Sequence, residues 1–309
     1  MRIVITGALG HIGSELIRSL RPGDATEVVL IDDLSTQRYC SLFNLPDAVP
    51  YRFIEANILT ANLDQLLRAD DIVVHLAALT NATASFENQS EVERVNLEGT
   101  ERIALACVNT GARLIFLSTT SVYGVSDGVV DESADESQLQ PQSPYATSKR
   151  QAELLLARLG REMSLKFVTC RFGTIYGISP GMRFHTAINK FVWQACMGLP
   201  LTVWRTALDQ KRPYLDLRDG VRAIRFFIGR DLDNQIYNVL TDNATVGEIV
   251  DKLRELVPDL RVDLVESQIM NQLSYTVANE KIKGIGFQSE GNLATALAQS
   301  ISLLKNARA

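Results

Sequence analysis

The chain has 309 residues, of which 46% are hydrophobic and 22% charged, an ordinary composition for a soluble globular enzyme. Its net charge of -5 argues against a nucleic-acid partner, and no apolar run is long enough to span a membrane. The four cysteines lack metal-site spacing, and the chain shows no signal peptide or disulfide pattern. We therefore expect a cytoplasmic protein without a bound metal.

The chain begins with a pattern of strand, glycine-rich turn and helix. Residues 2–5 are predicted to form a buried strand and residues 14–20 an amphipathic helix, with Gly7, Gly10 and Gly13 between or beside them. Gly7 allows a sharp turn, Gly10 lets the backbone approach a pyrophosphate, and Gly13 lets the helix pack closely on the strand. This pattern is the dinucleotide-binding fingerprint, although a glycine-rich turn without a ligand is the alternative.

The second predicted strand, residues 27–32, ends in an acid, Asp32. An acid at this place accepts hydrogen bonds from both hydroxyls of an adenosine ribose and repels a 2′-phosphate. The pattern therefore favours NAD over NADP. A helix cap or turn acid is the alternative for Asp32.

The remaining pattern alternates strands with helices. Strands are predicted at residues 51–55, 71–78, 113–117, 166–170 and 236–239, and helices at 91–108 and 145–160. This alternation predicts an α/β fold, a doubly wound parallel sheet of the Rossmann type. We expect an NAD-binding domain over residues 1–172, with a returning segment near 213–240.

A smaller C-terminal α/β substrate lobe is expected over residues 173–309, closing a cleft over the carboxyl ends of the strands. In it we predict helices at 184–197 and 245–256, a strand at 199–203 and a last helix after Gly291. His75, at the end of an apolar run, is interpreted as structural.

Tyr145 and Lys149 lie one helical turn apart, so both side chains share one face of the predicted helix. An ammonium about 4 Å from a phenol, at an effective dielectric of about 20, favours the phenolate by about 4 kcal/mol, or about three pKa units. Beside a cationic nicotinamide ring, the pair predicts a base that accepts an alcohol proton during hydride transfer. Taken alone, the Tyr-x-x-x-Lys pattern is weak evidence for a catalytic pair. The alternative is a tyrosine and a lysine on the exposed face of a surface helix. The hydroxyl-rich segment 118–121 strengthens the prediction.

Six segments extend these observations along nearly the whole chain: TGALGHIG (6–13), DDLST (32–36), HLAA (75–78), NLEGT (96–100), STTSVYG (118–124) and SPYATSK (143–149). In combination they resemble the motifs of the extended short-chain dehydrogenase/reductases. The resemblance is greatest to the nucleotide-sugar epimerases and dehydratases of that family.

The resemblance implies a role for each matching residue. Tyr145 would be the catalytic base, Lys149 would hold the nicotinamide ribose, and Thr119 would hydrogen-bond the reacting sugar hydroxyl. The implied NAD-binding residues are Gly7, Gly10, His11, Ile12, Gly13, Asp32, Asp33, Asn57, Ile58, Leu76, Ala77, Ala78, Thr80, Asn96, Ser118, Tyr145 and Lys149. The implied substrate-binding residues are Ser85, Thr119, Thr120, Asn189, Arg212 and Asn271, with Arg212 matching an arginine that grips a diphosphate.

The sequence also departs from the family pattern. Thr174 stands where the family usually has an asparagine, and His11 stands where phenylalanine is more usual. Many relatives carry a second diphosphate arginine near the place of Gln268, and this chain has none there.

The expected reaction follows from the residues after Thr119. The family's 4,6-dehydratases carry Asp-Glu there, whereas this chain carries Thr120 and Ser121, which do not titrate near neutrality. The resemblance therefore favours an NAD-dependent epimerase of a nucleotide-diphosphate sugar, with hydride transfer through a keto-sugar intermediate. A reductase or dehydrogenase, a dehydratase, and a non-catalytic nucleotide sensor are the alternatives.

The family also implies a homodimer through a four-helix bundle, here formed by the helices at 91–108 and 145–160. Leu155, Leu156 and Leu159 are apolar candidates for the dimer face, although packing on the sheet is the alternative.

Overall fold

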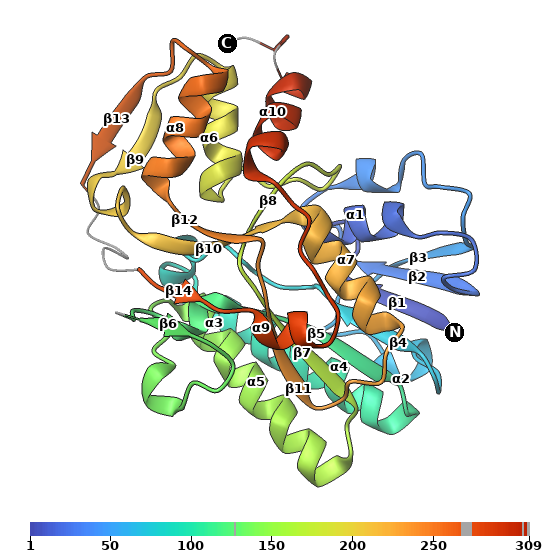
Figure 1. Ribbon diagram of the computed structural model, residues 1–309. Helices are drawn as coiled ribbons and strands as arrows, with labels where there is room; N and C mark the ends of the chain where they lie inside the picture. The colour runs from blue at the N-terminus through green and yellow to red at the C-terminus, as the bar shows by residue number, and fades with distance from the viewer. Residues whose placement is uncertain (127, 267–273, 305, 308–309) are drawn as a thin grey trace.

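A computed structural model describes residues 1–126, 128–266, 274–304 and 306–307 of the chain. Its central feature is a seven-stranded sheet in which neighbouring strands are parallel (Figure 1). In spatial order the strands are β11 (Gln235–Val239), β7 (Phe167–Phe172), β5 (Arg113–Thr119), β4 (Ile72–His75), β1 (Arg2–Thr6), β2 (Glu27–Asp32) and β3 (Tyr51–Glu55). This Rossmann-like sheet confirms the predicted fold class.

Helices cover both faces of the sheet, because its strands are apolar on both sides. Along β1, Ile3 and Ile5 pack with one group of helices, and Val4 packs with the other. The first group is α1 (His11–Ser19) and α7 (Leu217–Ile228). The second comprises α2 (Leu63–Leu66), α4 (Gly99–Thr110) and α5 (Pro144–Met163), with α3 (Gln89–Glu93) packed against α5.

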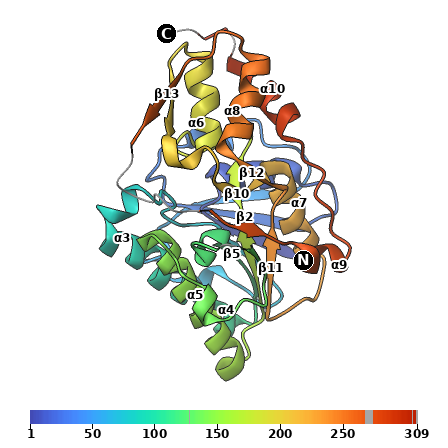
Figure 2. The ribbon, with the colours of Figure 1, turned by 60° about the vertical axis from the view of Figure 1, so that its left-hand side comes forward.

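A smaller lobe lies above the sheet (Figures 1 and 2). Its helices α6 (Ala187–Cys196), α8 (Val246–Leu256) and α10 (Leu293–Leu304) share one apolar core. Thr245 begins α8 with a capping box to Glu248, which confirms the predicted helix start. After β7 the chain leaves the main sheet, and it returns to pair β11 with β7.

Three small sheets complete the fold. They pair β8 (Thr174–Tyr176), β10 (Lys211–Asp216) and β12 (Asp242–Thr245); β9 (Leu201–Trp204) with β13 (Val262–Val265); and β6 (Val129–Val130) with β14 (Thr276–Val277). The short helix α9 (Glu280–Gly284) contacts β11. Of these strands, the sequence predicted only the one near β9. The division of the chain at residue 172 stays a prediction.

Several element boundaries differ from those predicted, and the differences matter for the cavity. β5 extends to Thr119, two residues beyond the predicted end, and β4 ends at His75. A π-helical turn, Arg94–Glu98, interrupts the predicted helix 91–108. α6 begins only at Ala187, so residues 184–186 precede the helix.

Two expectations about the surface can be compared with the structure. Leu155, Leu156 and Leu159 are buried within the subunit core, so they are wrong as candidates for an exposed dimer face. The homodimer and the cytoplasmic location stay predictions. Among the residues described, no helix combines the length and the apolar character needed to cross a membrane.

Candidate active site

A cavity of about 710 Å³ opens where the carboxyl ends of the main strands face the small lobe. Its place follows from the topology. The chain runs from β1 through β2 to β3 and then returns to β4 on the other side of β1. Ligands bind parallel α/β sheets at this reversal of strand order.

The three glycines of the first turn form one wall of this cavity. Gly7 has a φ of +64°, and a Cβ there would lie 2.6 Å from the backbone nitrogen of Ala77. A Cβ on Gly13 would lie 2.4 Å from the carbonyl oxygen of Ala8, so α1 approaches the turn after β1 more closely than a side chain allows. The geometry matches the roles that the fingerprint gives to Gly7 and Gly13.

Asp32 lies at the cavity's far end, on the last position of β2. Its carboxylate accepts hydrogen bonds of 3.0 Å from the backbone nitrogens of Leu9 and Leu34. These bonds fix the acid beside the glycine turn. Asp33 accepts a 3.1 Å hydrogen bond from the Asn57 side chain, and both residues line the cavity.

The turn after β4 forms a third wall. Its small residues leave room for a ligand, and Leu76, Ala77, Ala78 and Thr80 all line the cavity. His75 is buried below them between the hydroxyls of Thr6 and Thr100, at 2.7 and 3.1 Å. Burial lowers the pKa of His75 to about 3, so its ring is neutral and structural, as expected.

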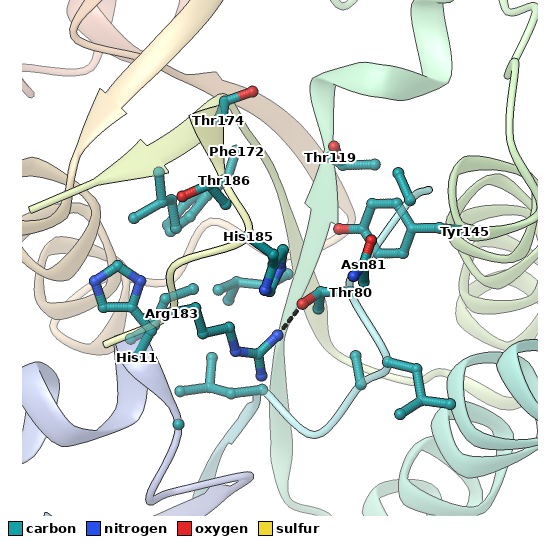
Figure 3. A pocket seen from close by; sticks show the side chains of 18 of the residues that line it. His11, Thr80, Asn81, Thr119, Tyr145, Phe172, Thr174, Arg183, His185 and Thr186 are labelled. Atoms are coloured by element: carbon teal, nitrogen blue, oxygen red, sulfur yellow. Dashed lines mark hydrogen bonds between the residues drawn. The ribbon is translucent and has the colours of Figure 1, made fainter. Parts of the chain in front are cut away.

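Thr119 and Tyr145 meet at the other side of the cavity (Figure 3). Thr119 ends β5, and Tyr145 stands in the first turn of α5, which Ser143 caps by accepting a hydrogen bond from the Ala146 nitrogen. Both side chains line the cavity, and Thr119 lies close enough to Tyr145 to act on the pKa of its phenol, against the effect of burial. The end of β5 and the start of α5 thus place Thr119 and Tyr145, which are distant in sequence, side by side in the cavity.

Lys149 follows one turn later on α5 and is buried. Its ammonium donates a 2.8 Å hydrogen bond to the carbonyl oxygen of Leu117 and lies 4.7 Å from the centre of the Phe116 ring. Burial lowers the pKa of Lys149 to about 7, which the negative charge of Glu153 partly opposes.

The expected lowering of the Tyr145 pKa by Lys149 is wrong for the protein alone. Burial raises the pKa of Tyr145 to about 12, although Thr119 and the charge of Arg183 act in the opposite direction. Lys149 is held at the Leu117 carbonyl, so it does not shift the Tyr145 pKa here. The phenol is therefore protonated at neutral pH, and its activation requires further positive charge.

Most of the predicted site residues line this one cavity. They are Gly7, Gly10, His11, Ile12, Gly13, Asp32, Asp33, Asn57, Ile58, Leu76, Ala77, Ala78, Thr80, Ser118, Thr119, Tyr145, Lys149 and Arg212. Ser118 reaches it only in part, because its hydroxyl donates a 2.6 Å hydrogen bond to buried Glu153.

Four predicted residues lie outside the cavity lining and instead support it. Asn96 bonds both backbone groups of Leu79, and Ser85 accepts from the Tyr145 nitrogen at 3.3 Å. Buried Thr120 lies within 3.4 Å of the Phe172 carbonyl oxygen, to which its hydroxyl donates.

Asn189, the fourth, is buried and accepts a 3.2 Å hydrogen bond from the Gly177 nitrogen. Its amide donates to the Arg183 carbonyl oxygen at 2.9 Å. These bonds shape the chain before α6. Asn271 and Gln268 lie outside the described residues.

Three further cations that were not predicted, Arg38, Arg183 and Lys190, also line the cavity, together with His185, which is neutral because burial lowers its pKa to about 4. Figure 3 shows Arg183 and His185 projecting into the cavity across from Tyr145. Arg183 donates a hydrogen bond to the hydroxyl of Thr80. The signal that could have found two of them is the basic pair Arg183 and His185 just after a glycine-rich stretch, and His185 falls in the helix predicted from residue 184.

The cavity residues fit a dinucleotide. Gly10 offers a backbone without a Cβ at the wall, and Asp32 offers an acid where a ribose would lie. Nη1 of Arg38 and Nε of Arg183 are buried without hydrogen-bond partners in the part of the chain that is described. Such nitrogens suit phosphate oxygens. Within the same residues, no cluster of His, Cys, Asp and Glu side chains could hold a metal ion.

Comparison with known proteins places the chain in a family. The model of the NAD dependent epimerase/dehydratase family matches residues 3–239. The uncharacterized UDP-glucose epimerase YtcB of Bacillus subtilis is 33% identical over 83% of this chain and 82% of its own length. The structure of MoeE5 in complex with UDP-glucuronic acid and NAD has a TM-score of 0.86 and 29% identity, covering 99% of this chain and all of that one.

A trifunctional relative from Arabidopsis thaliana broadens the comparison. It is a UDP-glucose 4,6-dehydratase, UDP-4-keto-6-deoxy-D-glucose 3,5-epimerase and UDP-4-keto-L-rhamnose-reductase, 32% identical over 94% of this chain. The chain spans only 45% of that protein's length.

These matches show that the chain belongs to the NAD-dependent epimerase/dehydratase family. NAD is the cofactor of this family, which confirms the cofactor predicted from Asp32 and the glycine turn.

Proposed function

We propose that the protein is an NAD-dependent epimerase of a nucleotide-diphosphate sugar that works through a keto-sugar intermediate. The observation that carries this proposal is the chemistry around Thr119. Thr119 and Tyr145 both line the cavity, and Thr119 acts to lower the pKa of the Tyr145 phenol against the effect of burial. Of the next two residues, Thr120 donates into the protein core and Ser121 lines the cavity with a hydroxyl. An acid and base for eliminating water are thus missing from the two positions where the family's dehydratases carry them.

The chain's own residues supply the proton chemistry. Tyr145 accepts the proton of the sugar hydroxyl, and Thr119 orients that hydroxyl by a hydrogen bond. Lys149 places an ammonium beneath the site, where it favours the phenolate once its bond to Leu117 is exchanged. NAD would supply the hydride acceptor and donor for this chemistry, together with the positive charge that the Tyr145 phenol requires for its activation.

The substrate end of the cavity lies in the small lobe. Arg212 on β10 and Lys190 on α6 line it there, together with Phe191 and Tyr214. A bidentate arginine suits the diphosphate of a nucleotide sugar, and an aromatic wall suits its base or sugar. MoeE5, which binds UDP-glucuronic acid and NAD, supports this substrate class.

The second candidate is a sugar dehydratase, favoured by the 4,6-dehydratase activity in the name of the Arabidopsis relative. It predicts a 6-deoxy-4-keto product rather than an epimer. A reductase would instead consume NADH in proportion to product.

The test incubates the purified protein with UDP-glucose, UDP-glucuronic acid and dTDP-glucose and follows the sugar signals by NMR. An epimerase yields a sugar inverted at one carbon while bulk NAD stays constant. Tyr145→Phe should lose at least a hundredfold in turnover yet still bind NAD, because the general base contributes about 10²–10⁴. Tyr39→Phe, at an exposed tyrosine, is the matched control. A dehydrated product, or near-normal turnover in Tyr145→Phe, would refute the proposal.

A further inference from the structure

The chain between β8 and α6, residues 177–186, lies across the glycine turn and is tied to it. His11 donates a 3.0 Å hydrogen bond from Nε2 to the Gly177 carbonyl oxygen. The Ser179 hydroxyl donates to the His11 carbonyl oxygen at 2.9 Å, and the Gly181 nitrogen donates to the Ser14 hydroxyl at 3.0 Å. We call residues 177–186 the strap.

The strap approaches the glycine turn as closely as backbones can. A Cβ on Gly181 would lie 2.4 Å from the Leu9 carbonyl oxygen and 2.5 Å from that of Gly10. Asn189 also fixes the strap by donating to the Arg183 carbonyl oxygen. The backbone that carries Arg183 is therefore held on both sides.

Arg183 reaches from the strap over the glycine turn. Its Nη2 lies 3.8 Å from the place that a Cβ on Gly10 would take, and Nη1 of Arg38 lies 4.0 Å from the same place. The two guanidinium groups thus meet above Gly10, one from the loop after β2 and one from the strap. Arg183 also donates to Thr80, on the turn after β4, so it spans the cavity (Figure 3).

Among the described residues, Asp32 is the carboxylate that acts on both arginines, so one negative charge faces two positive ones. Burial and, to a smaller extent, the positive charge of Arg38 lower the pKa of Arg183 to about 10. Asp32 is the carboxylate that opposes this shift, and its oxygens already accept from Leu9 and Leu34. Nε of Arg183 and Nη1 of Arg38 have no hydrogen-bond partner among the described residues. Two like charges held this way favour an anion with several oxygens.

We propose that Arg183 and Arg38 bind the pyrophosphate of NAD over the glycine turn, and that the strap, fastened by His11, holds Arg183 in place for this contact. The inference rests on the NAD cofactor of the family and not on which sugar reaction the protein catalyses. In Rossmann domains the glycine turn and the helix after it usually bind the cofactor's pyrophosphate. Here the strap, which leads into the small lobe, would also contribute to that binding.

The observations favour the cofactor's pyrophosphate over the diphosphate of the substrate. Both arginine contacts converge on Gly10, the glycine that the fingerprint reserves for the cofactor's phosphates. Arg212 and Lys190 remain at the small-lobe end for a second diphosphate.

The test uses ligands that share adenosine but differ in phosphate. NAD-free protein is titrated with NAD, ADP-ribose and adenosine, and separately with UDP as a probe of the substrate site. Arg183→Gln and Arg38→Gln should each weaken NAD and ADP-ribose about ten- to hundredfold, the loss expected for one charged hydrogen-bonding partner. Adenosine should bind each variant as it binds the wild type, and Arg183→Lys should lose less than Arg183→Gln.

The controls separate a lost contact from a damaged protein. Arg254→Gln removes the same charge at an exposed site in the small lobe and should change no affinity. Thermal unfolding of each NAD-free variant checks the fold. Unchanged NAD and ADP-ribose affinities in Arg183→Gln would overturn the inference. It would equally fail if UDP affinity fell while NAD affinity held, because Arg183 would then belong to the substrate diphosphate.

Discussion

Arg171 on β7 and Glu153 on α5 form a buried ion pair with two hydrogen bonds, 2.9 Å from Nε to Oε1 and 2.7 Å from Nη2 to Oε2. Ser118 and Arg150 donate to the same carboxylate. The pair joins the main sheet to the helix that carries Tyr145. Glu153 also lies one turn beyond Lys149, where its charge raises the Lys149 pKa against the effect of burial.

Removing one partner of this pair should destabilise the fold. Glu153→Gln leaves the buried Arg171 guanidinium without its counter-charge, so we expect the free energy of unfolding to fall by about 3 kcal/mol or more in urea titrations. Asp251→Asn, which removes an exposed pair with Arg254, should cost less than about 1 kcal/mol. Equal losses of unfolding free energy in the two variants would show that the buried ion pair stabilises the fold no more than the exposed one.

The hydroxyl of Thr119 should matter for turnover more than for binding. Thr119→Val removes the hydroxyl that acts on the Tyr145 phenol and that is proposed to bond the sugar hydroxyl, and we expect kcat to fall about ten- to hundredfold. Thr119→Ser keeps the hydroxyl and should retain most of the activity. NAD content of the purified variants is the control, and a kcat that is insensitive to valine would exclude Thr119 from the chemistry.

The close contact of the strap with the glycine turn should tolerate no side chain. In Gly181→Ala the new methyl group would meet two carbonyl oxygens at about 2.5 Å, so strap and turn must move apart. We expect weaker NAD binding, measured by titration, and a lower melting temperature. Gly229→Ala, at an exposed position with a φ of -87° where a Cβ meets no atom within 4 Å, controls for loss of a glycine. NAD affinity equal to that of the wild type would contradict the packing described.

His11 should make stability depend on pH. Burial lowers its pKa from 6.5 to about 4 in the folded protein. Below pH 6.5 the unfolded chain binds a proton that the folded chain refuses until about pH 4, so stability is full above pH 6.5 and falls as the pH drops through this window. The loss is at most about 1.4 kcal/mol per pH unit.

Replacing His11 by phenylalanine removes the protonation of His11 from the pH dependence of stability. The other two histidines remain in both proteins, so their effect is the same in each. Urea unfolding at pH 7 and pH 5 should show a smaller difference in His11→Phe than in the wild type. An identical pH slope would mean that His11 is not protected from protonation.

The predicted dimer can be tested on α5. Leu154 is 48% exposed on this helix, whereas Leu156 is fully buried. If two copies pair through α4 and α5, Leu154→Asp should yield monomers by light scattering while the fold persists. Leu156→Asp should instead unfold the subunit, because its charge enters the core. A wild-type protein that scatters as a monomer at micromolar concentration would end the dimer hypothesis.

The sheet could be predicted because its strands are short apolar runs, and the glycine turn because each glycine has a backbone reason. Strand ends were harder. β5 continues through Ser118 and Thr119, and the Ser118 hydroxyl donates to Glu153, which lies on a helix distant in sequence. Local apolarity cannot show such a continuation.

The cation cluster was missed for a similar reason. Phe184 and its neighbours have helical spacing with α6, yet residues 184–186 stay outside the helix because the strap is bound to the glycine turn. Arg183 enters the cavity only through that tertiary contact. The pKa of Tyr145 likewise depends on burial and on the Leu117 carbonyl that holds Lys149, and neither is visible in a four-residue spacing.

The late return of β11 has a consequence for biosynthesis. β7 lies between β5 and β11, so a nascent chain released only as far as Phe172 presents β7 with one row of unpaired backbone groups. An unpaired edge strand of this kind can form backbone hydrogen bonds with an extended segment of another chain. We expect the first 172 residues, expressed alone, to aggregate, and co-translational folding of the sheet to wait until residue 239 has left the ribosome.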